Sequence, residues 1–464
     1  MSLVPAPDLA PGPDLSIAEA GAALRAGRLT AAGLLDAHLA RIRSEQGAAL
    51  HAVEVLLEET ARAEAAAADA AFAEGRDLGP LHGIPVGVKA LFDVAGLPTT
   101  GGSRVPAPPA AADSAVVARL RAGGAVVAAT LATYEFATVG PDDTLAAPPA
   151  RNPWNPAHVT GGSSSGSAAA VAGGLLRATI GTDTGGSIRS PAAFSGVVGL
   201  KPSHGRVSAA GLLPLSPSLD HAGPLAATVG DAALALDAVS EPGWRPAAGA
   251  LGQGAEGLTI GYARAWLADD PMTDRSVLKA LDDAASVLSL AGARIREVVP
   301  PEIERFKDAG ATILAAEAME GHRARIMAHG AAYGRAALKS LLGGLLLTAE
   351  DLALARRAAA LLTAEMDETF AGIDALLTAT TLAPAPKVSA FAGGRAVWTP
   401  MRTLPFNVTG HPALSLPCGF AGGLPIGAQL VARKGAEDML CRIGHAFEMA
   451  TDVALQRPPG FATA

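Results

Sequence analysis

The chain has 464 residues, of which 50% are hydrophobic and 17% charged, and its formal net charge is −8. This apolar content excludes a largely disordered chain, and the lack of Lys- or Arg-rich runs speaks against a nucleic-acid-binding surface. Cys418 and Cys441 have no CxxC spacing, which excludes a disulfide framework and a cysteine-built metal site. No apolar run is long enough to span a bilayer, and the N-terminus lacks the pattern of a secretory signal. We therefore expect a cytoplasmic protein with neither a membrane nor a nucleic-acid partner.

The first third of the chain predicts helices followed by the beginning of a sheet. Residues 1–14 are Pro-rich and are expected to form a loose tail. Ser16 and Thr30 are typical helix N-caps, and the patterns that follow predict helices over 17–27, 31–46 and 57–75. Val- and Ile-rich runs then predict strands over 84–94 and 125–131, with a helix at 114–124 before the second strand. This order is half of a βαβ unit, the building block of parallel or mixed sheets.

The remaining chain continues this alternation and adds a long helical stretch. Helices are predicted over 229–240, 274–291 and 437–450, and the pattern of 302–370 is almost wholly helical. Strands are predicted over 258–263, 374–381, 413–419 and 425–433. We find no internal repeat, and the pattern indicates one large α/β domain with a helical insertion.

Lys89 is the first residue that suggests chemistry, because it lies within the apolar run 84-IPVGVKALF-92. A lysine in such a run is commonly an edge-strand charge that reaches water. The functional alternative is a desolvated lysine. Burial lowers the pKa of such a lysine from its usual value of about 10.4, so that a neutral amine is available near neutral pH. The residues alone leave both interpretations open.

The segment 161-GGSSSGSAAAVAGG-174 is rich in glycine and serine. In isolation it is typical of a flexible linker. It runs into an apolar stretch at 168–180 that predicts a helix, and so it also fits a glycine-rich turn at a helix N-terminus. A Walker-type phosphate site would require Gly-Lys-Ser/Thr, and the missing lysine makes nucleotide binding a weak hypothesis.

A second glycine-rich segment is 181-GTDTGGSIRSPA-192. Its two glycines before Ser187 would let the backbone approach a ligand closely, as an oxyanion site requires. The alternative is a tight turn between strand and helix, in which Ser187 merely caps the helix.

Together these segments resemble the amidase signature family, whose core is a GGSS(G/S)GS block followed by GTDxGGSIRxPA. Ser163 follows Lys89 by 74 residues and precedes Ser187 by 24. The likeness extends over nearly the whole chain, with further family-like segments at 81–103, 151–156, 196–208, 219–226, 404–419 and 424–433. The resemblance implies an α/β fold with a large, mixed, twisted β-sheet covered by helices on both faces, together with a helical insertion.

The resemblance also implies which residues act. Ser187 would be the nucleophile, Ser163 a bridging serine that follows a cis peptide bond, and Lys89 the base of a Ser-cisSer-Lys triad. Four backbone N–H groups would bind the oxyanion, those of Thr184, Gly185, Gly186 and Ser187.

Further residues match family positions without an expected role in bond making. Ser164, Asp183 and Arg189 are expected to brace the oxyanion turn, and His82 is expected to support the Lys89 strand. The ten histidines have no HExxH spacing, and neither a metal nor an organic cofactor is implied.

Three departures from the family pattern bear on the substrate. The stretch 138–150 is unusually long and Pro-rich and is a candidate entrance loop. The helical insertion and the Pro-rich loop 384–400, with Trp398, are candidates for capping an apolar pocket, although a lone tryptophan is more often a core residue. Ser165 replaces a common glycine and is expected to be neutral.

Our leading functional hypothesis is a stand-alone amidase that hydrolyses small aryl or alkyl amides, with carbamates (urethanes) as an extension. The alternative is the amidase subunit of a tRNA-dependent amidotransferase, which acts within an assembly. A catalytically dead scaffold is disfavoured because Lys89, Ser163 and Ser187 are all present.

We expect a single amidase domain over 15–464 after the loose tail. Its parts would be N-terminal helices at 15–76, a catalytic core at 77–230, a helical insertion with loops at 231–400, and a return to the sheet at 401–464. The expected partner is a small-molecule amide or carbamate, and the expected state is a monomer or homodimer.

Overall fold

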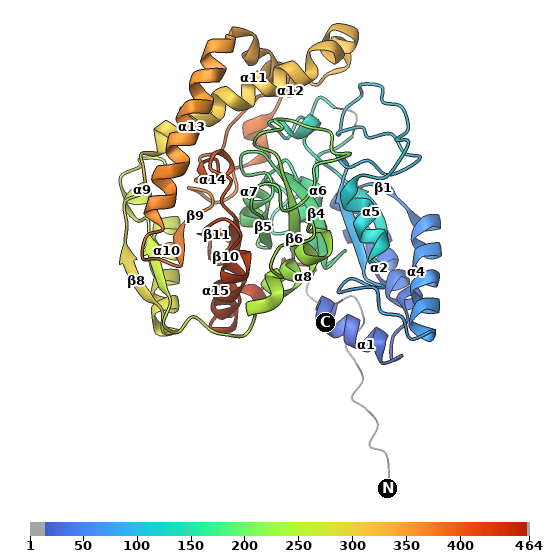
Figure 1. Cartoon of the computed structure of the whole chain (residues 1–464). Helices are drawn as coiled ribbons and strands as arrows, with labels where there is room; N and C mark the ends of the chain where they lie inside the picture. The colour runs from blue at the N-terminus through green and yellow to red at the C-terminus, as the bar shows by residue number, and fades with distance from the viewer. Residues whose placement is uncertain (1–13, 146, 462–464) are drawn as a thin grey trace.

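A computed structural model describes residues 14–145 and 147–461 of the chain. The expected N-terminal tail, apart from Asp14, therefore lies outside the described residues. An eleven-stranded mixed sheet runs through the molecule, in the order β1-β3-β2-β4-β6-β5-β10-β11-β9-β7-β8 (Figure 1). The strands are β1 (Val53–Leu56), β2 (Pro85–Lys89), β3 (Val126–Leu131), β4 (Ala178–Asp183), β5 (Val198–Lys201), β6 (His221–Ala226), β7 (Thr259–Tyr262), β8 (Arg294–Glu297), β9 (Ala375–Ala379), β10 (Ala413–Ala421) and β11 (Leu424–Val431).

The strand directions confirm the mixed sheet that the resemblance implies. Strand β2 is parallel to both β3 and β4, whereas β4, β6, β5, β10, β11 and β9 follow one another in antiparallel pairs. Strand β7 is parallel to β8 and β9 at the other end of the sheet. Strands β2, β3 and β4 are buried along their whole length, as expected of inner strands covered on both faces.

Helices cover both faces of this sheet (Figure 1). Helices α6 (Ser165–Ala172) and α7 (Arg189–Ser195) pack against the central strands on one face, and α8 (Val229–Val239), α10 (Arg275–Leu290) and α15 (Glu437–Met449) cover the other. The N-terminal helices are α1 (Ile17–Arg25), α2 (Ala31–Arg43), α3 (Glu45–Ala49), α4 (Glu58–Ala73) and α5 (Ala115–Ala122). The side chains of Ser16 and Thr30 accept hydrogen bonds from N–H groups of the first turns of α1 and α2, which confirms both predicted caps.

The helical pattern of 302–370 corresponds to a helical group that extends away from the sheet (Figure 1). It consists of α11 (Ile303–His329), α12 (Arg335–Leu342) and α13 (Ala349–Thr369), with α11 packed along α13. The short helices α9 (Ala265–Ala268) and α14 (Pro405–Val408) lie where this group meets the sheet. None of the helices in the described ranges is both long and apolar enough to cross a bilayer.

The prediction of one helix over 168–180 is wrong. Helix α6 ends at Ala172, and residues from Ala178 onward form β4, an inner strand between β2 and β6. The physical reason is the Gly173–Gly174 pair, since Gly174 has φ +67° and ends the helix in a left-handed turn.

Besides β4, four further strands were not predicted, namely β1, β5, β6 and β8. Strands β1 and β8 form the two edges of the sheet and expose charged side chains, so they lack a buried apolar run. Strand β6 contains Gly223 and Pro224, which normally count against a central strand.

Candidate active site

Lys89 ends β2 in the interior of the protein, with 0% of its surface exposed. Its Nζ lies 2.7 Å from Ser163 Oγ and 2.8 Å from Thr182 Oγ1, within hydrogen-bonding distance of both. Because β2 lies between β3 and β4, the side chain does not reach water, and the edge-strand interpretation is wrong. Burial lowers the pKa of Lys89 to about 7, although Asp183 and Asp220 favour the charged form.

Ser163 lies in the tight turn that leads into α6. The Gly162–Ser163 peptide bond is cis, as the resemblance implies. A Cβ on Gly162 would lie 2.2 Å from the ring of Tyr134, so only glycine allows this backbone to pass so close to the tyrosine. The turn is therefore an ordered part of the site, and the linker interpretation is wrong.

Ser187 lies in the turn between β4 and α7 and lines a pocket together with Gly161 and Gly162 of the first turn. The two turns are joined directly, because the N–H of Ser164 donates to the carbonyl of Ser187 at 3.2 Å. Segments 24 residues apart in sequence, from Ser163 to Ser187, thus meet at one wall of the pocket.

The second turn lines this pocket with four consecutive residues, Thr184 to Ser187. The N–H of Gly186 donates to Asp183 Oδ1 at 2.8 Å, so this expected oxyanion donor already has an acceptor. Among the residues that the structure describes, the N–H groups of Thr184, Gly185 and Ser187 have no acceptor within the protein. Three of the four expected donors are therefore free to bind an oxyanion.

Asp183 and Arg189 form a fully buried ion pair behind the turn. The Asp183 carboxylate accepts hydrogen bonds from the Arg189 guanidinium at 2.8 and 2.9 Å and from the N–H groups of Gly186 and Ile188. Burial alone would raise the pKa of Asp183, but the Arg189 charge outweighs it and holds that pKa well below its usual range. The contacts fit the bracing role expected of both residues.

Residues from distant parts of the chain complete this polar network. Arg189 also donates to Thr403 O, Gln429 Oε1 and Asn407 Oδ1, at 2.8, 2.7 and 2.6 Å. Ser164 Oγ donates to the carbonyl of Thr182 at 3.1 Å, which ties the first turn to β4.

Five residues near the site did not stand out in the sequence, namely Thr182, Asp220, Thr403, Asn407 and Gln429. All but Thr403 lie in segments where a glycine-rich or family-like motif was noted, but, apart from Gln429, no pattern within those segments distinguishes them as site residues. Gln429 is the polar residue in the buried strand β11, and that contrast is the only signal that could have found it.

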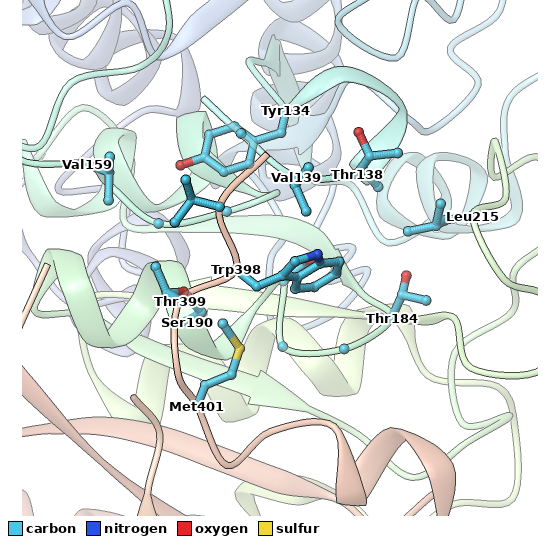
Figure 2. A pocket seen from close by; sticks show the side chains of 18 of the residues that line it. Tyr134, Thr138, Val139, Val159, Thr184, Ser190, Leu215, Trp398, Thr399 and Met401 are labelled. Atoms are coloured by element: carbon cyan, nitrogen blue, oxygen red, sulfur yellow. The ribbon is translucent and has the colours of Figure 1, made fainter. Parts of the chain in front are cut away.

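The pocket above Ser187 is lined mainly by apolar side chains and glycines. Its lining residues include Tyr134, Val139, Leu215, Trp398 and Met401, and none of the lining residues carries a charged side chain (Figure 2). The pocket therefore combines a largely apolar surface with the backbone of two glycine-rich turns and with the hydroxyls of Thr138, Thr184, Ser190 and Thr399.

The candidate entrance loop 138–150 and the candidate capping loop 384–400 both contribute to this pocket. Thr138, Val139 and Gly140, from the start of the Pro-rich stretch, line it, as does Trp398 from the loop after β9. Trp398 is 62% exposed, so it is a pocket-lining residue and not a core residue. Figure 2 shows its indole lying across the pocket between Val139 and Met401.

His82 lies apart from the reacting groups. It is buried, its ring stacks on Phe72 with centroids 4.0 Å apart, and its Nδ1 accepts from the N–H of Leu78 at 3.2 Å. It packs just before β2 and fits the expected support of that strand. Within residues 14–145 and 147–461, no group of three His, Cys, Asp or Glu side chains is arranged to hold a metal ion.

Comparisons with known proteins agree with this geometry. The family model described as Amidase matches residues 34–441. The chain is 37% identical over 494 residues to a subunit of the Glutamyl-tRNA(Gln) amidotransferase from Synechococcus sp. (strain WH7803), covering 96% of this chain and 98% of that protein.

Solved structures with the same fold include a peptide amidase and part of a protein complex. Native peptide amidase from Stenotrophomonas maltophilia is 31% identical, with a TM-score of 0.83 over 97% of this chain and 99% of that chain. An inhibitor-bound vestigial protein complex, described as revealing the evolutionary origins of an s-triazine catabolic enzyme, gives a TM-score of 0.87. The identity is 32%, over 94% of this chain and 98% of that chain.

The expected partner was a small-molecule amide or carbamate, and no nucleic acid was expected. These relatives contradict that expectation. Several relatives are named as subunits of an amidotransferase whose name includes a tRNA. The error has a physical reason: the lack of basic runs argues against direct binding of the phosphate backbone, but it says nothing about membership in an assembly. The family itself is unambiguous, because the match spans most of the chain and its relatives align over nearly their full length. The chain belongs to the amidase signature family of C–N hydrolases.

Proposed function

We propose that the chain cleaves a carboxamide through a Ser187 acyl-enzyme and acts as the amidase subunit of a tRNA-dependent amidotransferase. The observation that carries the chemistry is the buried contact between Lys89 Nζ and Ser163 Oγ at 2.7 Å, beside the turn that bears Ser187. The observation that supports the assembly is the likeness, over nearly their full length, to proteins named as amidotransferase subunits.

The proposed reaction begins with proton transfer along the three residues. Neutral Lys89 accepts the proton of Ser163, and Ser163 accepts that of Ser187 as Ser187 Oγ attacks the carbonyl carbon. The same relay in reverse delivers a proton to the leaving nitrogen, which amide cleavage requires. Water then attacks the acyl-enzyme by the same route and releases the acid.

The backbone of the second turn stabilises the intermediate. The free N–H groups of Thr184, Gly185 and Ser187 donate to the oxyanion, while Asp183 fixes the turn by binding the N–H groups of Gly186 and Ile188. Losing one oxyanion donor typically costs about 10²–10³ in rate, so the shape of this turn matters as much as the side chains.

Glutamine is the amide expected for an amidotransferase subunit, and its hydrolysis tests the assembly. The tagged chain is expressed in its source cells, recovered with any bound subunits, and compared with the purified chain alone for release of glutamate from L-glutamine. We expect Ser187-dependent release by the recovered assembly and little by the chain alone. If both samples are equally active, or if neither hydrolyses glutamine, the proposal that the chain acts as a subunit of an amidotransferase is contradicted.

A second candidate function is a stand-alone amidase for uncharged aryl or alkyl amides, including carbamates. The observation that favours it is the pocket lining, because no charged side chain there would pair with the ammonium and carboxylate of glutamine. The test is hydrolysis of p-nitroacetanilide and an aryl carbamate by the purified chain, with Ser187→Ala as control. Ser187-dependent turnover in the absence of any partner favours this candidate, and no turnover excludes it for these substrates.

A further inference from the structure

Asp220 connects two walls of the catalytic pocket through one carboxylate. It directly precedes β6 and is 7% exposed. Its Oδ1 accepts the hydroxyl of Thr184 at 2.5 Å, and its Oδ2 accepts the N–H groups of Leu215 and Ser216 at 3.0 and 3.1 Å. Thr184 and Leu215 both line the pocket, and Figure 2 shows them on the same side of it.

We propose that Asp220 is a positioning residue for the reaction, which holds Thr184 of the oxyanion turn at a fixed distance from the wall at Leu215. Thr184 is held through its side chain, so its N–H remains free to face the oxyanion. This inference rests on the proposed nucleophile and oxyanion donors, but not on which amide is the substrate.

The segment that carries Leu215 is anchored at a second point. Glu317 of α11 accepts the hydroxyls of Ser216 and Ser218, both at 2.7 Å, and is itself paired with Arg356 of α13 at 2.8 Å. Because Glu317 anchors this segment, the backbone that binds Asp220 is itself held in place, and Asp220 can fix the position of Thr184 relative to it. Each oxygen of the Asp220 carboxylate accepts a hydrogen bond from a different wall of the pocket, which fits a positioning role for this side chain.

Asp220 also acts on Lys89 through its charge. The charged or titratable groups around it are Lys89 of β2, Asp183 of β4, the adjacent His221, and Glu317 by way of Ser216. Burial raises the pKa of Asp220 to about 6, so the carboxylate is mainly ionised above that pH. An ionised Asp220 favours the protonated form of Lys89, and its removal should lower the pKa of the lysine.

The test follows the rate at which a fluorophosphonate labels Ser187 between pH 5.5 and 9.5. This probe reacts with the nucleophile whether or not the natural amide is known. Asp220→Asn and Thr184→Val should each lower the rate at the alkaline plateau by about 10- to 100-fold, as expected for a misplaced donor. The labelling rate of the double variant should be no more than about 3-fold below that of Asp220→Asn, since both substitutions break the same contact.

The pH profile separates positioning from general damage. Asp220→Asn should move the midpoint of the rise to lower pH, whereas Thr184→Val should leave it in place. Asp231→Asn is the matched control, because Asp231 is also buried but pairs with Arg177 away from the pocket, and it should change neither the plateau nor the midpoint.

Three results would overturn the inference: a normal plateau and midpoint for Asp220→Asn, a normal plateau for Thr184→Val, or losses that multiply in the double variant. If Asp220→Asn does not fold, the comparison of Thr184→Val with Thr184→Ser still tests the inference. The serine keeps the hydroxyl and should restore most of the rate lost in the valine variant, and equal rates for the two contradict the inference. A wild-type chain that labels at Ser187 but hydrolyses no amide would count against the proposed function alone.

Discussion

Lys89 Nζ lies 2.7 Å from Ser163 Oγ, and the other group it contacts is a second hydroxyl, that of Thr182. Within the part of the chain that the structure describes, Lys89 forms no salt bridge, and the carboxylates of Asp183 and Asp220 act on it only from farther away. Burial therefore outweighs the attraction of the carboxylates and lowers the pKa of Lys89 to about 7. A buried amine in contact with a serine hydroxyl is poised to accept its proton.

Hydrolysis should rise with pH through the pKa of Lys89. Because only the neutral amine accepts a proton, kcat/KM of the best amide is expected to increase about tenfold per pH unit below 7 and to level off above it. The measurement is a pH profile between 5.5 and 9.5. A profile that is flat over this range, with chemistry rate-limiting, contradicts a lysine base.

Ser163→Ala should impair amides more than esters with the same acyl group. The amine leaves only after it has received a proton through Ser163, whereas an activated aryl ester expels a stable phenolate without one. We expect a loss of at least about 10²-fold more for the amide than for the ester, from paired kcat/KM values. Ser187→Ala serves as the control and should abolish both reactions, while equal losses from Ser163→Ala would exclude the relay.

Lys89→Met should stabilise the folded chain, and the gain should depend on pH. In the unfolded chain Lys89 keeps its proton up to about pH 10.5, but in the folded chain it loses it near 7. The wild type therefore gains stability as pH rises from 7 to 10.5, so the advantage of methionine is largest below pH 7 and shrinks through that window. Urea unfolding at pH 6, 8 and 10 measures the difference. A constant advantage at all three values contradicts a buried, titrating lysine.

Arg189→Met should destabilise the fold strongly. It leaves the carboxylate of Asp183 buried without its cation, a change that typically costs about 3–5 kcal/mol. The measurement is the free energy of unfolding in urea. Arg305→Met, which breaks the exposed pair with Glu365, is the matched control and should have little effect. Similar losses of unfolding free energy for the two variants would contradict the large contribution to stability assigned to the buried pair.

Local signals in the sequence drew attention to Lys89 and to the two glycine-rich segments, and the family resemblance then assigned the proposed roles to Lys89, Ser163 and Ser187. Lys89 stands out as a charge within an apolar run, and Ser163 and Ser187 lie in glycine-rich segments. Each feature alone also fitted a simpler structure, namely an edge strand, a linker or a helix cap. Signals of this kind depend on neighbours in sequence. They are therefore readable before the fold is known.

The supporting network could not be predicted in the same way. Asn407 and Gln429 reach Arg189 only because α14 and β11 converge behind the turn, and their separation from Arg189 in sequence carries no pattern. The strand β6 was missed for a related reason. Its Pro224 opposes Ile180 of β4 in the middle of the sheet, where local preference alone argues against a strand.

The central claim is that Ser187 is the residue acylated during amide cleavage. It is tested most directly by trapping the covalent adduct with a fluorophosphonate and locating it by peptide mass spectrometry. We expect one adduct per chain, on the peptide that contains Ser187, formed faster at pH 8 than at pH 6 and absent from the Ser187→Ala variant. An adduct on Ser163 or elsewhere, or an amidase activity that survives complete labelling of Ser187, would contradict the claim.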